Sequence, residues 1–204
     1  MTNPYTIRTL MLASGERLPV LLDRETGFPL VEPTLYSVTE IRARNQASNT
    51  LEQVLRSILV FQLFLDLRHI DLDERLRQGQ VLELGEIDEL VRLCRLPVEL
   101  LVAQLTPTPK RHTPPRVTSL EPFRLHPTVH LEEVSASTAA NRVRVIRDFL
   151  NWLVKLRLSR LTPCNTMYGP LLAAGEMAQG ALNARVAGLC CTNPPPPQLG
   201  KIAA

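Results

Sequence analysis

The sequence predicts a mainly helical protein with a small β meander at its N-terminus. Two long stretches, residues 50–68 and 135–161, repeat apolar side chains at the three- and four-residue spacing of an amphipathic helix. Short apolar runs separated by turn residues occur before residue 40. Because 45% of the 204 residues are apolar, the chain can bury a core, and the low aromatic content of 4% leaves most of the packing to Leu, Val and Ile.

Residues 1–40 are predicted to form the β meander, or arm. Strands are expected at Arg8–Leu12, Arg17–Leu22 and Phe28–Val31. The segments between them contain Gly and Asp, which permit the backbone angles of a tight reversal. Three short strands are not stable alone, so we expect the meander to pack on the helices that follow.

Residues 41–186 are predicted to form one helical domain. Its first long helix, at about residues 50–68, has Asn49 as a candidate N-cap and Glu52 at the reciprocal capping position. Apolar residues extend almost all round this helix, which indicates a central position in the core. Two shorter helices are expected at Asp71–Arg77 and Glu83–Leu96.

Proline dominates the middle of this domain. Residues 97–134 contain seven prolines, which predicts a long, partly extended loop. A last helix is predicted at Leu171–Val186, although each of its two glycines costs about 1 kcal/mol relative to Ala. Residues 187–204 lack an apolar period and include four consecutive prolines, which is typical of a disordered tail.

The helix predicted at residues 135–161 gives the best indication of function. Ser135 or Ser137 can cap its start. The helix has six Lys/Arg residues and one acid, a net charge of +5, whereas residues 51–91 carry nine acids and four Arg, a net charge of −5. Three cations and an amide lie within one arc of the helical wheel: Arg144, Arg147, Asn151 and Lys155.

These four side chains are candidate contacts with DNA phosphates, because flexible cations along one helix edge suit a duplex backbone. The alternative is an ordinary solvated face. Lys110 and Arg111 are further candidates, as parts of a flexible basic arm, unless they only keep the Pro-rich loop soluble. Trp152 continues the apolar side of the helix, so we expect it in the core.

No metal or cofactor site is predicted. The four cysteines form no C-x-x-C pair, and no His lies at ligand spacing from them. Scattered thiols fit a reducing cytoplasm. The N-terminus shows no basic-then-apolar leader, and no apolar run reaches the ~18 residues that span a bilayer. We therefore expect a cytoplasmic protein with no cofactor and with neither a membrane nor a small-molecule partner.

The helix predicted at residues 135–161 contains a series of residues that also occurs in a known family of proteins. It reads Ser137-Thr138, then Arg144, Ile146, Arg147, Phe149 and Trp152-Leu153. This pattern resembles a core-binding helix of the tyrosine recombinases, the phage-integrase family. The opening stretch GERLPVLLDRETGFPLVEPTLY, the helix at 49–67 and the acidic stretch IDLDERLRQGQVLELGEIDEL are similar to the N-terminal half of bacterial integrases, so the resemblance covers roughly Ile7 to Val186.

The resemblance implies a helical, SAM-like core-binding domain that grips one face of double-stranded DNA. In this family a separate domain performs the chemistry with an Arg, a Lys, a His-x-x-Arg motif, a second His or Trp and a Tyr nucleophile. None of the four His residues here is followed by Arg at the third position, and the last tyrosine, Tyr168, lies in no such constellation. The chain is therefore expected not to be an enzyme, and a frameshift, a premature stop or a genuine variant would each explain the missing half.

Two classes of function remain open. The first is the DNA-binding N-terminal portion of a tyrosine recombinase, with double-stranded DNA and other integrase protomers as partners. The second is a helical protein-interaction module that uses the acidic region 66–89 and binds no nucleic acid. Affinity for DNA or heparin at low salt discriminates between them.

Overall fold

The computed structural model describes residues 3–44, 48–105 and 133–190. The protein is mainly helical with one small antiparallel sheet near the N-terminus, as the sequence predicts. No helix within these ranges combines the length and the apolarity that a bilayer crossing requires. The elements are β1 (Tyr5–Met11), β2 (Arg17–Asp23), α1 (Val31–Tyr36), a π-helical turn (Ser37–Ile41), a 3-10 turn (Arg42–Arg44), α2 (Ser48–Arg68), α3 (Leu72–Arg77), α4 (Leu84–Leu93), α5 (Val98–Leu105), α6 (Ala136–Leu158) and α7 (Tyr168–Cys190).

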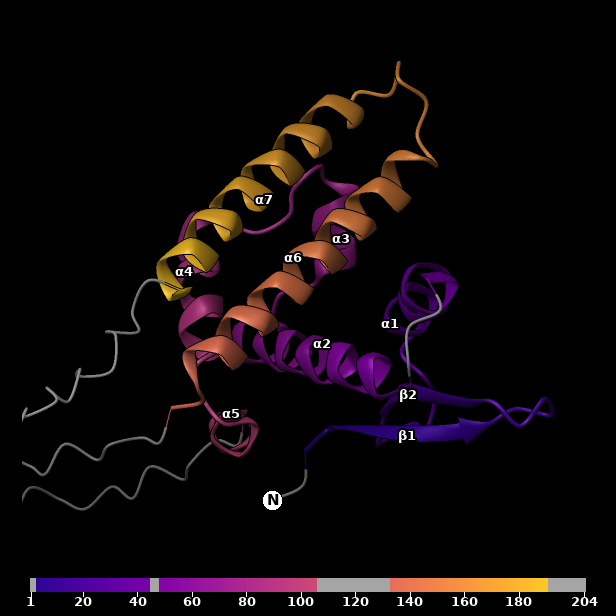
Figure 1. The fold of residues 1–204 in the computed structure, drawn as a ribbon. Coiled ribbons are helices and arrows are strands. Elements are labelled where there is room, and N and C mark those ends of the chain that lie inside the picture. The colour runs from indigo at the N-terminus through magenta and orange to yellow at the C-terminus, as the bar shows by residue number, and fades with distance from the viewer. Residues whose placement is uncertain (1–2, 45–47, 106–132, 191–204) are drawn as a thin grey trace, which may run out of the picture.

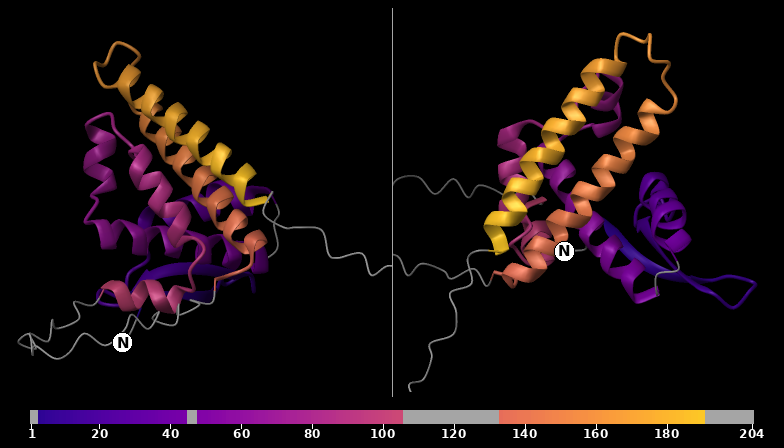
Figure 2. Two further views of the ribbon diagram at one scale, coloured as in Figure 1. Left: turned by 90° about the vertical axis from the view of Figure 1, so that its left-hand side faces the viewer. Right: turned by 45° about the horizontal axis from the view of Figure 1, so that its top comes forward.

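Helices α6 and α7 form a long antiparallel hairpin, and α2 crosses beneath the beginning of α6 (Figure 1). Helix α7 packs on α6 and α4, whereas the sheet packs on α2 (Figure 2). Both the sheet and the helices contribute to one cluster of buried side chains. The N-terminal segment therefore shares a core with the helical part of the chain.

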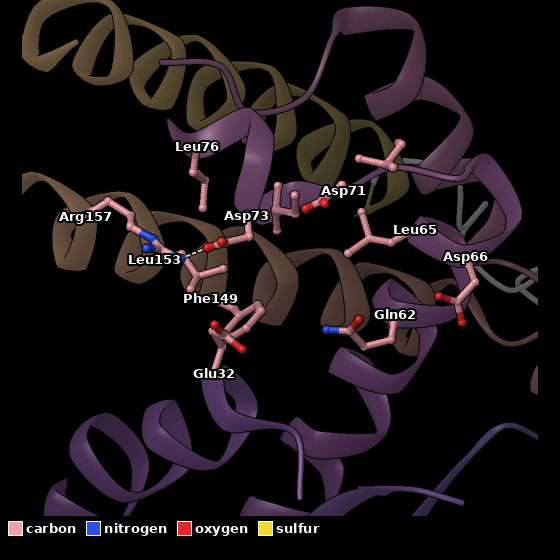
Figure 3. Close-up of a pocket in the computed structure, with 12 residues that line it drawn as sticks. Glu32, Gln62, Leu65, Asp66, Asp71, Asp73, Leu76, Phe149, Leu153 and Arg157 are labelled. Atoms are coloured by element: carbon pink, nitrogen blue, oxygen red, sulfur yellow. Dashed lines mark ion pairs between the residues drawn. The ribbon is translucent and has the colours of Figure 1, made fainter. Parts of the chain in front are cut away.

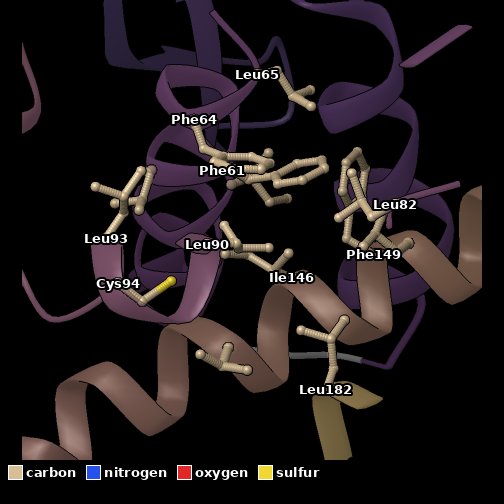
Figure 4. Packing of buried hydrophobic residues seen from close by; sticks show 14 of the residues in the cluster. Phe61, Phe64, Leu65, Leu82, Leu90, Leu93, Cys94, Ile146, Phe149 and Leu182 are labelled. Atoms are coloured by element: carbon tan, nitrogen blue, oxygen red, sulfur yellow. The ribbon is translucent and has the colours of Figure 1, made fainter. Parts of the chain in front are cut away.

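Helix α2 lies at the centre of that core. Its buried residues include Phe61 and Phe64, which face Ile146 and Phe149 of α6 (Figure 4). This confirms the prediction that α2 is central, which was based on apolar residues lying almost all round the helix. The helix begins at Ser48, so Asn49 lies within its first turn and not at the N-cap. Glu52 accordingly pairs with Arg56 one turn later, at 2.6 Å.

Helix α6 follows the prediction closely. The Ser135 hydroxyl accepts a hydrogen bond from the Thr138 N–H at 3.2 Å and caps the first turn. Its buried residues recur at helical spacing on the side facing α2 and α7: Ala139, Ala140, Val143, Ile146, Phe149, Leu150, Leu153 and Val154.

The N-terminal segment differs from the predicted meander. Strands β1 and β2 pair in register from Tyr5–Asp23 to Met11–Arg17. The expected third strand is reduced to a single bridge between Leu22 and Pro29, flanked by hydrogen bonds from the Leu30 N–H to the Leu21 carbonyl at 2.9 Å and from the Asp23 N–H to the Phe28 carbonyl at 3.0 Å. The chain then enters α1 at Val31, within the segment 1–40 that was predicted to be a meander.

The prediction of a loop at 97–134 was wrong for residues 98–105. Helix α5 (Val98–Leu105) forms there and buries Leu101 and Val102. Pro97 precedes the helix, where its missing N–H costs no helical hydrogen bond, and its carbonyl accepts from the Leu101 N–H at 3.4 Å. Residues 106–132 lie outside the described ranges.

Helix α7 is longer than the predicted Leu171–Val186 and continues through residues 187–190, which were expected to be disordered. Leu189 is 3% exposed, so the additional turn is held by core packing. The rest of the predicted tail, 191–204, lies outside the described residues.

Candidate nucleic-acid interface

Two of the predicted contact residues lie together on α6. Asn151 is half-buried and Lys155 is exposed, one helical turn further on, and both line the same solvent-open hollow of about 400 Å³. Neither side chain has a hydrogen-bond or ion-pair partner among the described residues. Arg144 is half-buried and already interacts with other groups of the protein. Lys110 and Arg111 lie outside the described ranges.

Arg147 turns away from that hollow and towards α7. Its guanidinium donates to Asn183 Oδ1 at 2.7 Å and to Asp148 Oδ1 at 2.7 and 2.9 Å, and the side chain is 23% exposed. With Asn151 it lines a small gap between α6 and α7. Arg147 therefore bridges the two helices, although the helical wheel places it on the same edge as Lys155.

Two more cations of the basic helix also hold the fold together. Arg142 donates to the carbonyl oxygens of Cys94 and Leu96 at 3.0 and 2.7 Å, just past the end of α4. Burial lowers the pKa of the Arg142 guanidinium. These bonds satisfy carbonyls just past the end of α4, which stops at Leu93 and not at the predicted residue 96. Arg157 forms an ion pair with Asp73.

The hollow beside Lys155 includes residues that sequence reasoning missed. Arg44, from the 3-10 turn that precedes α2, borders it with a side chain that is 67% exposed. Arg44 also pairs with Glu40 at 2.9 Å. We call this site the aromatic hollow, and it is lined by Tyr36, Glu40, Ile41, Arg44, Val54, Val145, Asp148, Asn151, Trp152 and Lys155.

Trp152 and Tyr36 give the hollow its aromatic surface. The Trp152 indole stacks on Phe149, with ring centroids 6.0 Å apart and planes 19° apart, and it packs against the core as expected. Its centroid lies 5.4 Å from that of Tyr36. Because Trp152 is only partly buried, one portion of the indole belongs to the core and another borders the hollow.

A second pocket, of about 210 Å³, lies between α1, α2, α3 and α6 (Figure 3). Four carboxylates line it, and Arg157 reaches in from α6 to pair with Asp73. Asp66, also in this pocket, accepts a hydrogen bond from the Tyr5 hydroxyl. Burial raises the pKa of Asp66, and the bond from Tyr5 offsets part of that effect. Asp71 accepts a hydrogen bond from the Glu74 N–H at 3.0 Å, so three of the four carboxylates are already engaged within the fold.

The acidic region 66–89 is also largely paired within the fold. Glu86 receives two hydrogen bonds from Arg75, at 2.6 and 2.8 Å. Burial alone would raise the pKa of Glu86, but these bonds, a backbone N–H and nearby arginines bring it below its usual value. Further ion pairs join Arg68 to Glu89, Arg77 to Asp73, and Arg185 to Asp88.

The tyrosines Tyr5 and Tyr36 are held in their neutral form. Burial, the hydrogen bond to Asp66 and nearby carboxylates raise the pKa of Tyr5. Burial and Asp148 raise the pKa of Tyr36 to about 12. Within the described ranges, no group of three or more His, Cys, Asp or Glu side chains is placed to hold a metal ion.

No protein-family model, curated protein sequence or solved structure matches the chain.

Proposed function

We propose that the chain binds double-stranded DNA through its phosphate backbone, as the non-catalytic DNA-gripping portion of a tyrosine recombinase. The observation that carries the proposal is the placement of Lys155 and Asn151 beside Arg44, on the solvent-exposed side of a helix whose segment has a net charge of +5. An exposed ammonium and a guanidinium attract phosphates, and an amide can donate a further hydrogen bond to a phosphate oxygen.

The contact surface is narrower than the four-residue edge read from the sequence. Arg142, Arg147 and Arg157 are engaged within the protein. The proposed contacts are therefore Asn151 and Lys155, together with Arg44, whose side chain is 67% exposed although it pairs with Glu40 at 2.9 Å. A duplex bound by so few phosphate contacts is bound weakly, and its affinity has a shallow dependence on salt, because the log–log slope is about −0.9 per contact.

The direct test is fluorescence anisotropy of a labelled duplex titrated with the full chain at low salt. We expect saturable binding that weakens with added salt and differs little between duplex sequences. The Lys155→Ala variant should bind several-fold more weakly, because one phosphate contact is lost. Absence of binding at low salt would overturn the proposal.

The proposal includes no strand cleavage. A tyrosine nucleophile must lose its phenolic proton during attack, and the environments of Tyr5 and Tyr36 oppose that loss. A duplex that traps a covalent intermediate should give no protein–DNA adduct. A stable adduct through Tyr5, Tyr36 or Tyr168 would contradict this part of the proposal.

Action on DNA in the cytoplasm also accords with the free thiols of Cys94 and Cys164.

A second candidate is a helical protein-interaction module. The acidic region 66–89 is a weak contact surface for it, because so many of its charges are paired. Helix α7 favours it more, since Glu176 and Arg185 are its two charged residues and Leu172 and Met177 are 40% and 41% exposed. Failure to bind DNA or heparin at low salt would favour this candidate.

A further inference from the structure

The aromatic hollow differs from a flat phosphate-contact surface in shape. Its free volume is about 400 Å³. Sites that enclose a small molecule or a single group usually have volumes of about 300–1,000 Å³, so the hollow falls within that range. Trp152 and Tyr36 supply its rings, and the stacking of Trp152 on Phe149 holds the indole in place. A rigid aromatic surface of this kind suits a flat ring system.

Two polar groups at the hollow, the Asn151 amide and the Lys155 ammonium, remain available to a ligand. Glu40 is paired with Arg44 at 2.9 Å, and Asp148 with Arg147 at 2.7 Å. The Asn151 amide and the Lys155 ammonium have no such partner in the described part of the chain. An amide offers a donor and an acceptor to the polar edge of a ring, and an ammonium attracts a phosphate as a point charge.

We propose that the aromatic hollow accepts one unpaired nucleotide of bound DNA. The base stacks on Trp152, Asn151 hydrogen-bonds its edge, and Lys155 contacts an adjoining phosphate. Stacking on an aromatic side chain is open to every base because each has a π face, whereas a base within a duplex is already stacked on its neighbours. The hollow thus favours DNA with a bulge or an unpaired end. This inference rests on the proposed function and narrows its ligand.

Trp152 provides a direct reporter, because it is the one tryptophan in the chain. The full chain is titrated with a paired duplex and with the same duplex carrying one unpaired thymidine, while anisotropy and tryptophan emission are both recorded. We expect the bulged duplex to quench Trp152 and to bind at least about fivefold more tightly, since stacking of one base contributes roughly 1–3 kcal/mol.

Two variants separate the roles of Asn151 and Lys155. Each replaces a side chain at the edge of the hollow and leaves the fully buried side chains of the core in place. Asn151→Ala should remove the preference for the bulged duplex and, because it loses one hydrogen bond to a phosphate, weaken binding of the paired duplex by less than Lys155→Ala does. Lys155→Ala should weaken both. Circular dichroism confirms that each variant is folded.

The outcomes distinguish the two proposals. If both duplexes bind equally and neither quenches Trp152, the nucleotide site is wrong and backbone binding stands. If neither duplex binds at low salt, both proposals fail. Quenching by an aromatic peptide but not by the bulged duplex would assign the hollow to a protein partner and overturn the inference.

Discussion

The guanidinium of Arg142 lies at the junction of α6 with the end of α4. It reaches two backbone carbonyls, those of Cys94 and Leu96, that lie past the last turn of α4. The side chain is half-buried, so the loss of its water contacts is offset by these charged hydrogen bonds. Arg142 therefore stabilises the helix packing.

Replacing this side chain should cost stability. Arg142→Ala leaves both carbonyls without a donor and should lower the free energy of unfolding by about 1–3 kcal/mol, measured by urea denaturation. Arg160→Ala is the matched control, because Arg160 is exposed and follows the helix. Its effect should remain below ~0.5 kcal/mol. Equal effects of the two substitutions would contradict the capping role.

Asp66 should make stability depend on pH. Burial raises its pKa in the folded protein. The protonated form is thus favoured in the fold, and the associated stability is present below the unfolded pKa and is lost as pH rises through the folded value. In the Asp66→Asn variant the side chain cannot ionise, so this contribution to stability is not lost as pH rises. The free energy of unfolding of the variant, relative to wild type, should rise between about pH 4 and about pH 7.

A constant difference between variant and wild type across this pH range would show that the folded environment of Asp66 leaves its ionisation unchanged. The comparison uses the difference because other carboxylates, such as Glu86, have lowered pKa values and change stability in the opposite direction.

At the scale of the elements, α7 depends on a close approach to α6. A Cβ atom placed on Gly175 would lie 2.8 Å from Cγ1 of Val154, whereas one placed on Gly180 would have no neighbour within 4 Å. From sequence, both glycines weaken the helix alike. The structure gives Gly175 a packing role, because the absent side chain is what admits Val154.

The two glycines give a matched test. Gly180→Ala should stabilise the protein by about 0.4–1 kcal/mol, since Ala restricts the unfolded chain and strains nothing in the fold. Gly175→Ala should give no gain, because the new methyl group meets the stiff side chain of Val154. Thermal denaturation of both variants checks this. A rise in melting temperature for Gly175→Ala as large as that for Gly180→Ala would refute the close packing.

The long periodic helices were predicted most closely. Among the short elements, the two strands, α3 and α4 were predicted, whereas α1 and α5 were not. Helices α2 and α6 begin and end no more than three residues from their predicted bounds, because eight or more buried positions repeat along each. Helix α5 was missed because Pro97 was read as the end of a helix, although it stands at the start of one. The last turn of α7 depends on core contacts of Leu189 that no local signal reveals.

The candidate site shows the same limit. A helical wheel places Arg147 beside Lys155, but it cannot show that Asn183 of α7 lies within reach of the guanidinium. Nor does it contain Arg44, which reaches α6 only through the packing of the segment before α2. Predicting either one requires the arrangement of three separate elements.

At the scale of the whole molecule, the proposed DNA surface adjoins the shared core. Tyr36, just before the π-helical turn, packs against Phe149 of α6 with ring centroids 5.3 Å apart. This contact brings the segment carrying Arg44 to the side of α6 that carries Asn151 and Lys155. Helix α1, the turns that follow it and α6 therefore together place cations from distant parts of the sequence around one hollow.

The salt dependence of duplex binding tests this placement most directly. Dissociation constants are measured across a series of salt concentrations for wild type and for the double variant Arg44→Ala/Lys155→Ala. Wild-type binding should fall linearly on a log–log plot, and the double variant should have a slope shallower by about 1–2, because each lost phosphate contact removes about 0.9.

The control removes two cations elsewhere, in Arg77→Ala/Arg92→Ala, whose side chains are each 62% exposed. Because both double variants lose the same charge, a general effect of net charge would alter both slopes equally. The account predicts that the control keeps the wild-type slope and the Arg44/Lys155 variant does not. Equal slopes for wild type and the Arg44/Lys155 variant would contradict the proposed DNA surface.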